Sequence, residues 1–186
     1  MAVWAAPLLF AAAGCAYRVT PPADVRHPAT VYVADLGYHA SLLLPAGDGG
    51  YAEFAYGQWR WFALNEDTWL DGIGAMLIPQ RGALARRILV APKNERELSS
   101  AIGSEAVLSI VVEARNAAEL LSRLTQRWEQ AAQTAHYNPV IGMTLVHDPS
   151  RYSALHNCNS VVTDWLRELG CRVRGGALWA DFRLAD

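Results

Sequence analysis

The pentapeptide HNCNS at positions 156–160 constrains this 186-residue chain most, because a regular helical pattern starts directly after it. Apolar residues recur at helical spacing over positions 161–169, and Gly170 is a natural stop. Asn157 is suited to be the N-cap, which places Cys158 in the first turn. Free N–H groups and the helix dipole at that end favour a thiolate over a thiol. The pattern predicts a nucleophilic cysteine of lowered pKa, with a small core residue as the alternative.

The composition favours one globular domain and excludes a nucleic-acid partner. A chain of 186 residues is long enough to bury a hydrophobic core. The net charge is −2 and charged residues make up 18% of the chain, so the basic surface that nucleic acid requires is not expected. The sequence predicts a mixture of hairpin strands and segregated helices, which indicates an α+β fold.

The first fifteen residues resemble a bacterial lipoprotein signal. Residues 1–14 are small and apolar and lead into Cys15, which would become the acylated first residue of the mature chain. The run is too short for a transmembrane helix. We therefore expect a signal segment over residues 1–15, a proline-containing tether over 16–29 and a single domain over 30–186. The protein would then be anchored by lipid in the cell envelope, on the periplasmic side.

Lipidation at Cys15 would leave two cysteines, Cys158 and Cys171, in an oxidising compartment. The predicted helix between them is about a dozen residues long, which separates them by roughly 18 Å at 1.5 Å per residue. A disulfide needs Cα atoms within about 7 Å. Cys158 is therefore predicted to be a free thiol, and Cys171 a structural one.

The remaining elements follow from residue periodicity and turn signals. A glycine-rich turn over 45–50 predicts a hairpin between the strands on either side of it. A helix with Asn116 as its cap and Glu119 completing a capping box is predicted after a long apolar strand. Strands are expected at 30–34, 40–44, 51–56, 85–90, 104–113 and 143–146, further helices at 64–77 and 94–102, and a loop at 136–142.

His39 is the histidine best placed to serve as a base. It opens the strand at 40–44, and Glu53 is the carboxylate of the next strand, in an otherwise apolar run. Pairing through a five-residue loop centred on Gly47 sets His39 opposite Ala55. Glu53 is then its diagonal neighbour on the same face, roughly 7 Å away between Cα atoms. A slip of one residue in the register would send Glu53 to the other face.

The other histidines are weaker candidates for the base. His27, His136 and His147 fall in the predicted tether and loops, where surface positions are usual. His156 is two residues from Cys158, a spacing that usually points two side chains apart. Metal binding by His147, His156 and Cys158 matches no standard zinc spacing, so neither a metal nor another cofactor is expected.

Three motifs together resemble the permuted branch of the papain-like, NlpC-type superfamily, which includes lecithin retinol acyltransferase-like enzymes. They are the histidine motif at 31–39, the acidic motif at 53–57 and the cysteine motif at 152–159. More closely, they resemble a bacterial family of unknown function, some of whose members are encoded near urease genes. The similarity runs from about Thr30 to the C-terminus. Gln58 stands where that family has an acidic residue.

The resemblance implies an antiparallel sheet packed against helices, with the cysteine at a helix N-terminus. It implies Cys158 as nucleophile, His39 as base and Glu53 as orienting group, with thiol attack on an amide or ester through a thioester. A peptidoglycan peptide or an envelope lipid would be the substrate. Non-catalytic binding on the same fold is the alternative. The cleft would be lined by Tyr38, Tyr56, Trp59 and His156.

Overall fold

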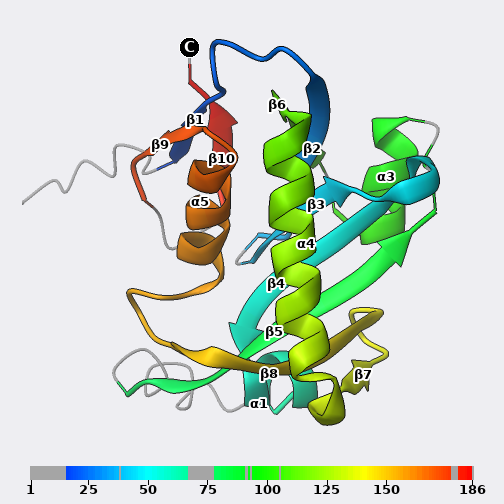
Figure 1. Cartoon of the computed structure of the whole chain (residues 1–186). Coiled ribbons are helices and arrows are strands. Elements are labelled where there is room, and N and C mark those ends of the chain that lie inside the picture. Colours follow the sequence, from blue (N-terminus) through cyan, green and yellow to red (C-terminus); the bar gives the residue numbers. More distant parts are fainter. Residues whose placement is uncertain are drawn as a thin grey trace, which may run out of the picture.

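The computed structural model describes residues 16–37, 39–66, 78–90, 92, 94–104, 106–176 and 180–185. They form a mixed α+β fold built around a seven-stranded antiparallel sheet, in the order β6-β2-β3-β4-β5-β8-β7 (Figure 1). A second, three-stranded sheet has the order β10-β1-β9. The strands of the large sheet are β2 (Pro28–Asp35), β3 (Ala40–Pro45), β4 (Tyr51–Gln58), β5 (Gln80–Leu89), β6 (Ala106–Glu113), β7 (His136–Asn138) and β8 (Met143–Tyr152). The small sheet comprises β1 (Tyr17–Thr20), β9 (Arg172–Arg174) and β10 (Phe182–Leu184).

Helices cover both faces of the large sheet. The described α-helices are α1 (Trp59–Leu64), α3 (Glu95–Ile102), α4 (Ala114–Gln130) and α5 (Cys158–Glu168). Helices α4 and α5 lie on the face turned toward the viewer in Figure 1 and bury the main apolar core against it. Residues of α1 and α3 belong to two smaller apolar clusters. We call the two sides of the sheet the α5 face and the α1 face.

The alternation of side chains along β3 and β4 separates the two faces. Leu42 and Phe54 pack into the core beneath α4 and α5. Leu43 and Ala55 contribute instead to the clusters on the α1 face. All four side chains are 0–1% exposed, so both faces of these central strands are buried. This explains why β3 reads as a continuous apolar run.

Most predicted strands are confirmed, and several are longer than predicted. The strand expected at 85–90 begins at Gln80, and the one expected at 143–146 continues to Tyr152. The predicted hairpin at 45–50 joins β3 to β4 through a short 3₁₀ turn, Gly47–Gly49. The helix predicted at 94–102 is α3, with the Asn94 side chain accepting the N–H of Glu97. Most of the helix predicted at 64–77 lies outside the described residues.

Three predictions about local structure differ from the observed fold. The loop expected at 136–142 begins with strand β7. Residues 17–20, expected within the tether, form β1, in which Tyr17 and Val19 are buried by alternation. The capping box predicted at Asn116 is wrong, because β6 runs directly into α4 with Glu113 as the N-cap residue. The Glu113 carboxylate accepts backbone N–H groups of Arg26 and His27 instead, at 2.8 and 3.2 Å. Within the described residues, no helix is long and apolar enough to cross a membrane.

Candidate functional site

Cys158 is the first residue of α5, as its sequence context predicts. Asn157 is the N-cap: its side chain accepts the Ser160 N–H at 3.0 Å, and the Ser160 hydroxyl accepts the Asn157 N–H at 2.8 Å. This reciprocal pair is a capping box, and it fixes the start of the helix. The side chains of Val161, Val162 and others then bury α5 against the sheet. The local sequence therefore holds the thiol at a rigid helix N-terminus.

The sulfur of Cys158 is buried and surrounded by hydrogen-bond donors. The residue is 5% exposed. Its sulfur is hydrogen-bonded by the backbone N–H groups of Asn159, Ala40 and Cys158 itself, and by the Tyr152 hydroxyl. These donors lower the pKa of the Cys158 thiol, but burial raises it more, so the pKa lies above its ordinary value. The lowered pKa predicted from the helix N-terminus is therefore wrong, because desolvation outweighs the donors.

Cys158 and Cys171 do not form a disulfide with each other, as predicted. Both thiols are buried. Burial raises the pKa of Cys171 to about 11. At 5% exposure, each cysteine presents little of its surface to a reagent.

His39 directly precedes the residue that contacts the thiol, but its own ring turns to the α1 face. The residue that follows it, Ala40, donates its N–H to the Cys158 sulfur. The ring contacts Phe62 of α1, with 4.6 Å between centroids. Its Nε2 is buried without a hydrogen-bond partner. Burial lowers the pKa of His39 to about 4, so the imidazole is neutral at pH 7.

Glu53 shares a face with His39, but through a different register from the predicted one. The structure pairs Ser41, not His39, with Ala55. The prediction is wrong by two residues because the five-residue turn spans 46–50, one position later than the loop centred on Gly47. A shift of two preserves the face. The Glu53 carboxylate accordingly lies diagonal to Ser41 and accepts its hydroxyl at 2.6 Å.

The second oxygen of Glu53 is engaged by Arg87 of β5, which the sequence analysis did not single out. Arg87 donates Nε–H to Glu53 at 2.5 Å, and its other nitrogens donate to the carbonyls of Ile141 and Ile102, each at 3.3 Å. The guanidinium therefore joins β4 to the C-terminus of α3 and to the turn that precedes β8. Glu53 and Arg87 are paired across β4 and β5, a signal the sequence carries only when the register of β5 is known.

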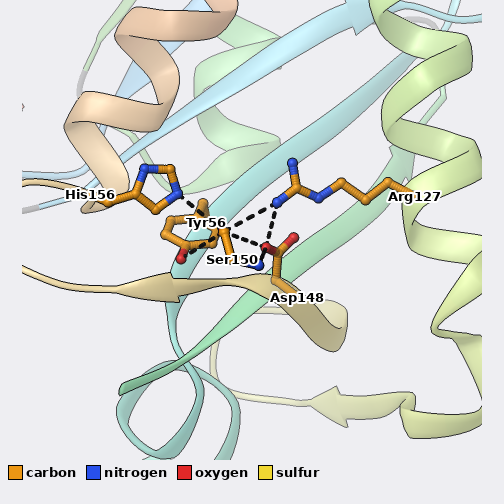
Figure 2. A network of polar contacts seen from close by, with 5 residues as sticks. All are labelled: Tyr56, Arg127, Asp148, Ser150 and His156. Atoms are coloured by element: carbon orange, nitrogen blue, oxygen red, sulfur yellow. Dashed lines mark hydrogen bonds and ion pairs between the residues drawn. The ribbon is translucent and has the colours of Figure 1, made fainter. Parts of the chain in front are cut away.

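His156 belongs to a buried polar network on the α5 face, shown in Figure 2. Its Nε2 lies 3.1 Å from the Ser150 hydroxyl, which also contacts the Tyr56 hydroxyl at 3.1 Å and donates to Asp148 at 2.5 Å. Arg127 of α4 forms an ion pair with the fully buried Asp148 carboxylate. The network ties the segment that delivers Cys158 to β4 and α4.

Of the four residues predicted to line the cleft, Tyr56 and His156 are brought together, and Trp59 lies on the α1 face. Tyr38 lies outside the described residues. Tyr56 is 1% exposed, and burial raises its pKa to about 12. Trp59 packs edge-on against His147 of β8, with 4.1 Å between centroids. Tyr56 and His156 border a small cavity of about 150 Å³ near Arg127 and Asp148.

A larger cavity, which we call the His39 cavity, lies on the α1 face and has a volume of about 760 Å³. His39, Glu53, Arg87, Trp61 and Phe62 are among its lining residues. Glu53 and Arg87, which the register of β4 against β5 pairs, form part of its lining. The cavity could not be predicted from the sequence, because this register depends on residues far apart in the chain.

Comparisons of the chain with known proteins do not assign it to a family. No protein-family model, curated protein or solved structure matches the chain.

Proposed function

We propose that the protein is a cell-envelope thiol hydrolase or acyltransferase, acting on an amide or ester with Cys158 as nucleophile. One observation carries the proposal: the sulfur sits at the N-terminus of α5, within hydrogen-bond reach of the N–H of Ala40, the residue that follows the neutral His39. A thiol, a base and a cluster of backbone donors are the parts that acyl transfer requires.

In the resting site the Cys158 thiol and the His39 imidazole are both neutral. Burial raises the pKa of Cys158 and lowers that of His39 to about 4. An ion pair of thiolate and imidazolium is thereby disfavoured, since both charged forms lose hydration. His39 would then act as a general base, taking the thiol proton as the carbonyl is attacked.

The chemical steps follow from this arrangement. The Cys158 proton passes to Nε2 of His39 while the sulfur forms a bond to the carbonyl carbon. Transfer needs the His39 ring to turn away from Phe62 and toward the sulfur. The N–H groups of Cys158 and Asn159 then hold the oxyanion. The leaving amine or alcohol takes the proton from His39, and water or an acceptor alcohol or amine resolves the thioester.

The order of elements is consistent with a permuted papain-like, NlpC-type fold. His39 directly precedes β3, Glu53 lies on the antiparallel β4, and α5 packs on both strands with Cys158 as its first residue. In this proposal Glu53 is a positioning residue. It holds Ser41 on one side and Arg87 on the other, and so stiffens the strand that follows His39.

Acylation of the sulfur tests the proposal directly. Incubation of the full chain with p-nitrophenyl octanoate is expected to add one octanoyl group, located on Cys158 by intact-mass and peptide mass spectrometry. Cys158→Ala should abolish the adduct. Cys171→Ala, the matched control, should leave it unchanged. An adduct that persists in Cys158→Ala, or none in the wild type, contradicts the proposal.

A non-catalytic binding module is the second candidate, and one observation favours it. Both Glu53 oxygens are engaged by Ser41 and Arg87, so this carboxylate does not orient the His39 ring in the structure. A binding module would keep the His39 cavity and show no acylation of Cys158. The acylation experiment separates the two functions.

We also propose that the chain is anchored in the cell envelope by lipid on Cys15, which lies outside the described residues. Cys15→Ser is expected to move most of the protein from the membrane fraction to the soluble fraction, because acyl chains provide the membrane affinity. Cell fractionation with immunoblotting measures the shift. Wild-type protein found soluble with an intact Met1 would refute the anchor.

A further inference from the structure

The outer face of the small sheet is rich in arginine. The residues of β1, β9 and β10 include four arginines and no aspartate or glutamate. Tyr17, Val19 and Phe182 turn inward and belong to the main apolar core. Because side chains alternate along a strand, Arg18, which lies between Tyr17 and Val19, points away from the core. We call the outer side the arginine face; its four arginines, all exposed, are Arg18, Arg172, Arg174 and Arg183.

The strand register sets three of these arginines side by side. Arg18 is the Cα partner of Arg183 on β10 and of Arg174 on β9. Partners on neighbouring strands lie about 5 Å apart and share a face of the sheet. Arg172 lies two residues from Arg174 on β9 and so adds a fourth guanidinium to the same face. Like charges at this spacing repel and destabilise a sheet.

The protein supplies little counter-charge to the arginine face. Arg183 donates Nε–H to Asp181 at 2.6 Å. Within the described residues, the other three arginines of this face take part in no ion pair. The whole chain has a net charge of −2, so the arginine face is a local excess of positive charge. An anionic partner would remove the repulsion between these arginines.

The arginine face lies next to the predicted lipidation site. Strand β1 begins at Tyr17, two residues after Cys15, and Ala16 and Tyr17 are only 6% and 7% exposed. Two residues of extended chain span at most about 7 Å. Figure 1 shows β1, in blue, together with β9 and β10 beside α5. An acyl group on Cys15 would therefore hold the small sheet at the bilayer surface, with no tether between them.

We propose that the arginine face binds the anionic phospholipid surface of the membrane, with its guanidinium groups on the lipid phosphates. The planar guanidinium matches the geometry of a phosphate. Acyl chains combined with a basic patch give more stable membrane binding than one acyl chain alone. The proposal rests on the envelope location proposed above. It concerns a surface apart from the thiol, because Cys158 begins α5 and β9 follows the other end of that helix.

Vesicle co-sedimentation tests the arginine face without the acyl anchor. Full-chain Cys15→Ser is mixed with vesicles of phosphatidylcholine, or of phosphatidylcholine and phosphatidylglycerol. The apolar residues 1–14 meet the same hydrocarbon in both vesicles, so the difference in binding reports charge. Binding should be stronger to the anionic vesicles. It should weaken as the salt concentration rises from about 0.1 to 1 M, because the Debye length falls from about 10 to 3 Å.

Charge variants in this background identify the binding surface. Arg18→Gln combined with Arg174→Gln should weaken binding to the anionic vesicles about 30-fold, the equivalent of ~1 kcal/mol for each arginine near the surface. Arg60→Gln combined with Arg96→Gln is the matched control. These two arginines are exposed on α1 and α3, so the net charge changes equally and binding should stay nearly unchanged.

Urea denaturation checks that the weaker binding is not a loss of folding. The Arg18→Gln, Arg174→Gln variant should be at least as stable as its Cys15→Ser parent, because the repulsion across β1 is reduced. A less stable variant would assign these arginines to the fold and overturn the proposal. Equal binding to neutral and anionic vesicles, or equal weakening by the two double variants, would overturn it as well.

Two further measurements separate the arginine face from the functions proposed above. Displacement from the vesicles by inorganic phosphate at constant ionic strength would indicate a site for a small anion and would overturn the membrane surface. Acylation of Cys158 should be equal in the Arg18→Gln, Arg174→Gln variant and its parent. If the vesicle experiment fails and acylation persists, the thiol chemistry stands without the arginine face. If binding depends on the arginines and acylation is absent, only the catalytic function is overturned.

Discussion

Replacing Arg87 with methionine is expected to lower the free energy of unfolding by about 3–5 kcal/mol, the usual cost of breaking a buried ion pair. The Arg87 and Glu53 side chains are 17% and 1% exposed. Methionine removes the Nε–H bond to Glu53 and the bonds to the carbonyls of Ile141 and Ile102. The Glu53 carboxylate then remains buried with the Ser41 hydroxyl and without its counter-charge. Urea denaturation with linear extrapolation measures the loss.

Two companion variants identify the cause of that loss. Arg86→Met is the matched control, because Arg86 is the neighbour on β5 and stacks over Trp128 at 4.2 Å, a contact worth about 0.5–1 kcal/mol. Arg87→Met combined with Glu53→Gln should recover part of the stability, since no unpaired charge is left. Equal losses for Arg86→Met and Arg87→Met would show that the Glu53 pair does not brace the sheet.

His39→Ala is expected to slow acylation of Cys158 at pH 7 by about 10²–10⁴-fold, the range for loss of a general base. The rate is measured by p-nitrophenol release from p-nitrophenyl octanoate, with Cys158→Ala as the baseline. Added imidazole should restore part of the rate in His39→Ala and leave the wild type unchanged, because it can replace the missing base. A purely structural role for His39 would not give that rescue.

His156→Ala is the comparison variant for the base. His156 holds the segment before α5 through the Ser150 hydroxyl, and its loss should affect the rate less than loss of His39. A larger effect of His156→Ala, rescued by imidazole, would transfer the role of base to His156. Equal effects without rescue would indicate that both histidines serve structure.

The parts of the site that local sequence determines were predictable. Asn157 caps α5, and Cys158 is its first residue. Both assignments depend only on neighbours within one helical turn. The register of the β3–β4 hairpin could not be predicted from the sequence, because the turn could be centred on any of several residues in its glycine-rich segment. Gly49, with φ +74°, takes the left-handed conformation, and the loop spans 46–50. That choice places Ser41 opposite Ala55.

Long-range packing determined what the sequence could not show. The Cys158 pKa depends on how deeply α5 is buried against β3 and β4, and the helix terminus alone predicted the opposite direction. Arg87 contacts Glu53 because the register of β5 against β4 places the two residues opposite each other. Tyr17 and Val19 are buried on one face of β1, but nearby prolines mask this alternation in the sequence, which therefore predicts a tether there.

The pH dependence of Cys158 acylation tests the central claim most directly, that a neutral His39 serves a neutral thiol. With a His39 pKa of about 4 and a thiol pKa above its ordinary value, the wild-type rate should be level from about pH 5.5 to 8.5 and fall as pH decreases through about 4. In His39→Ala only the thiolate reacts, so the rate should rise about tenfold per pH unit over the same range. A wild-type rate that rises with pH as steeply as that of His39→Ala would contradict the account.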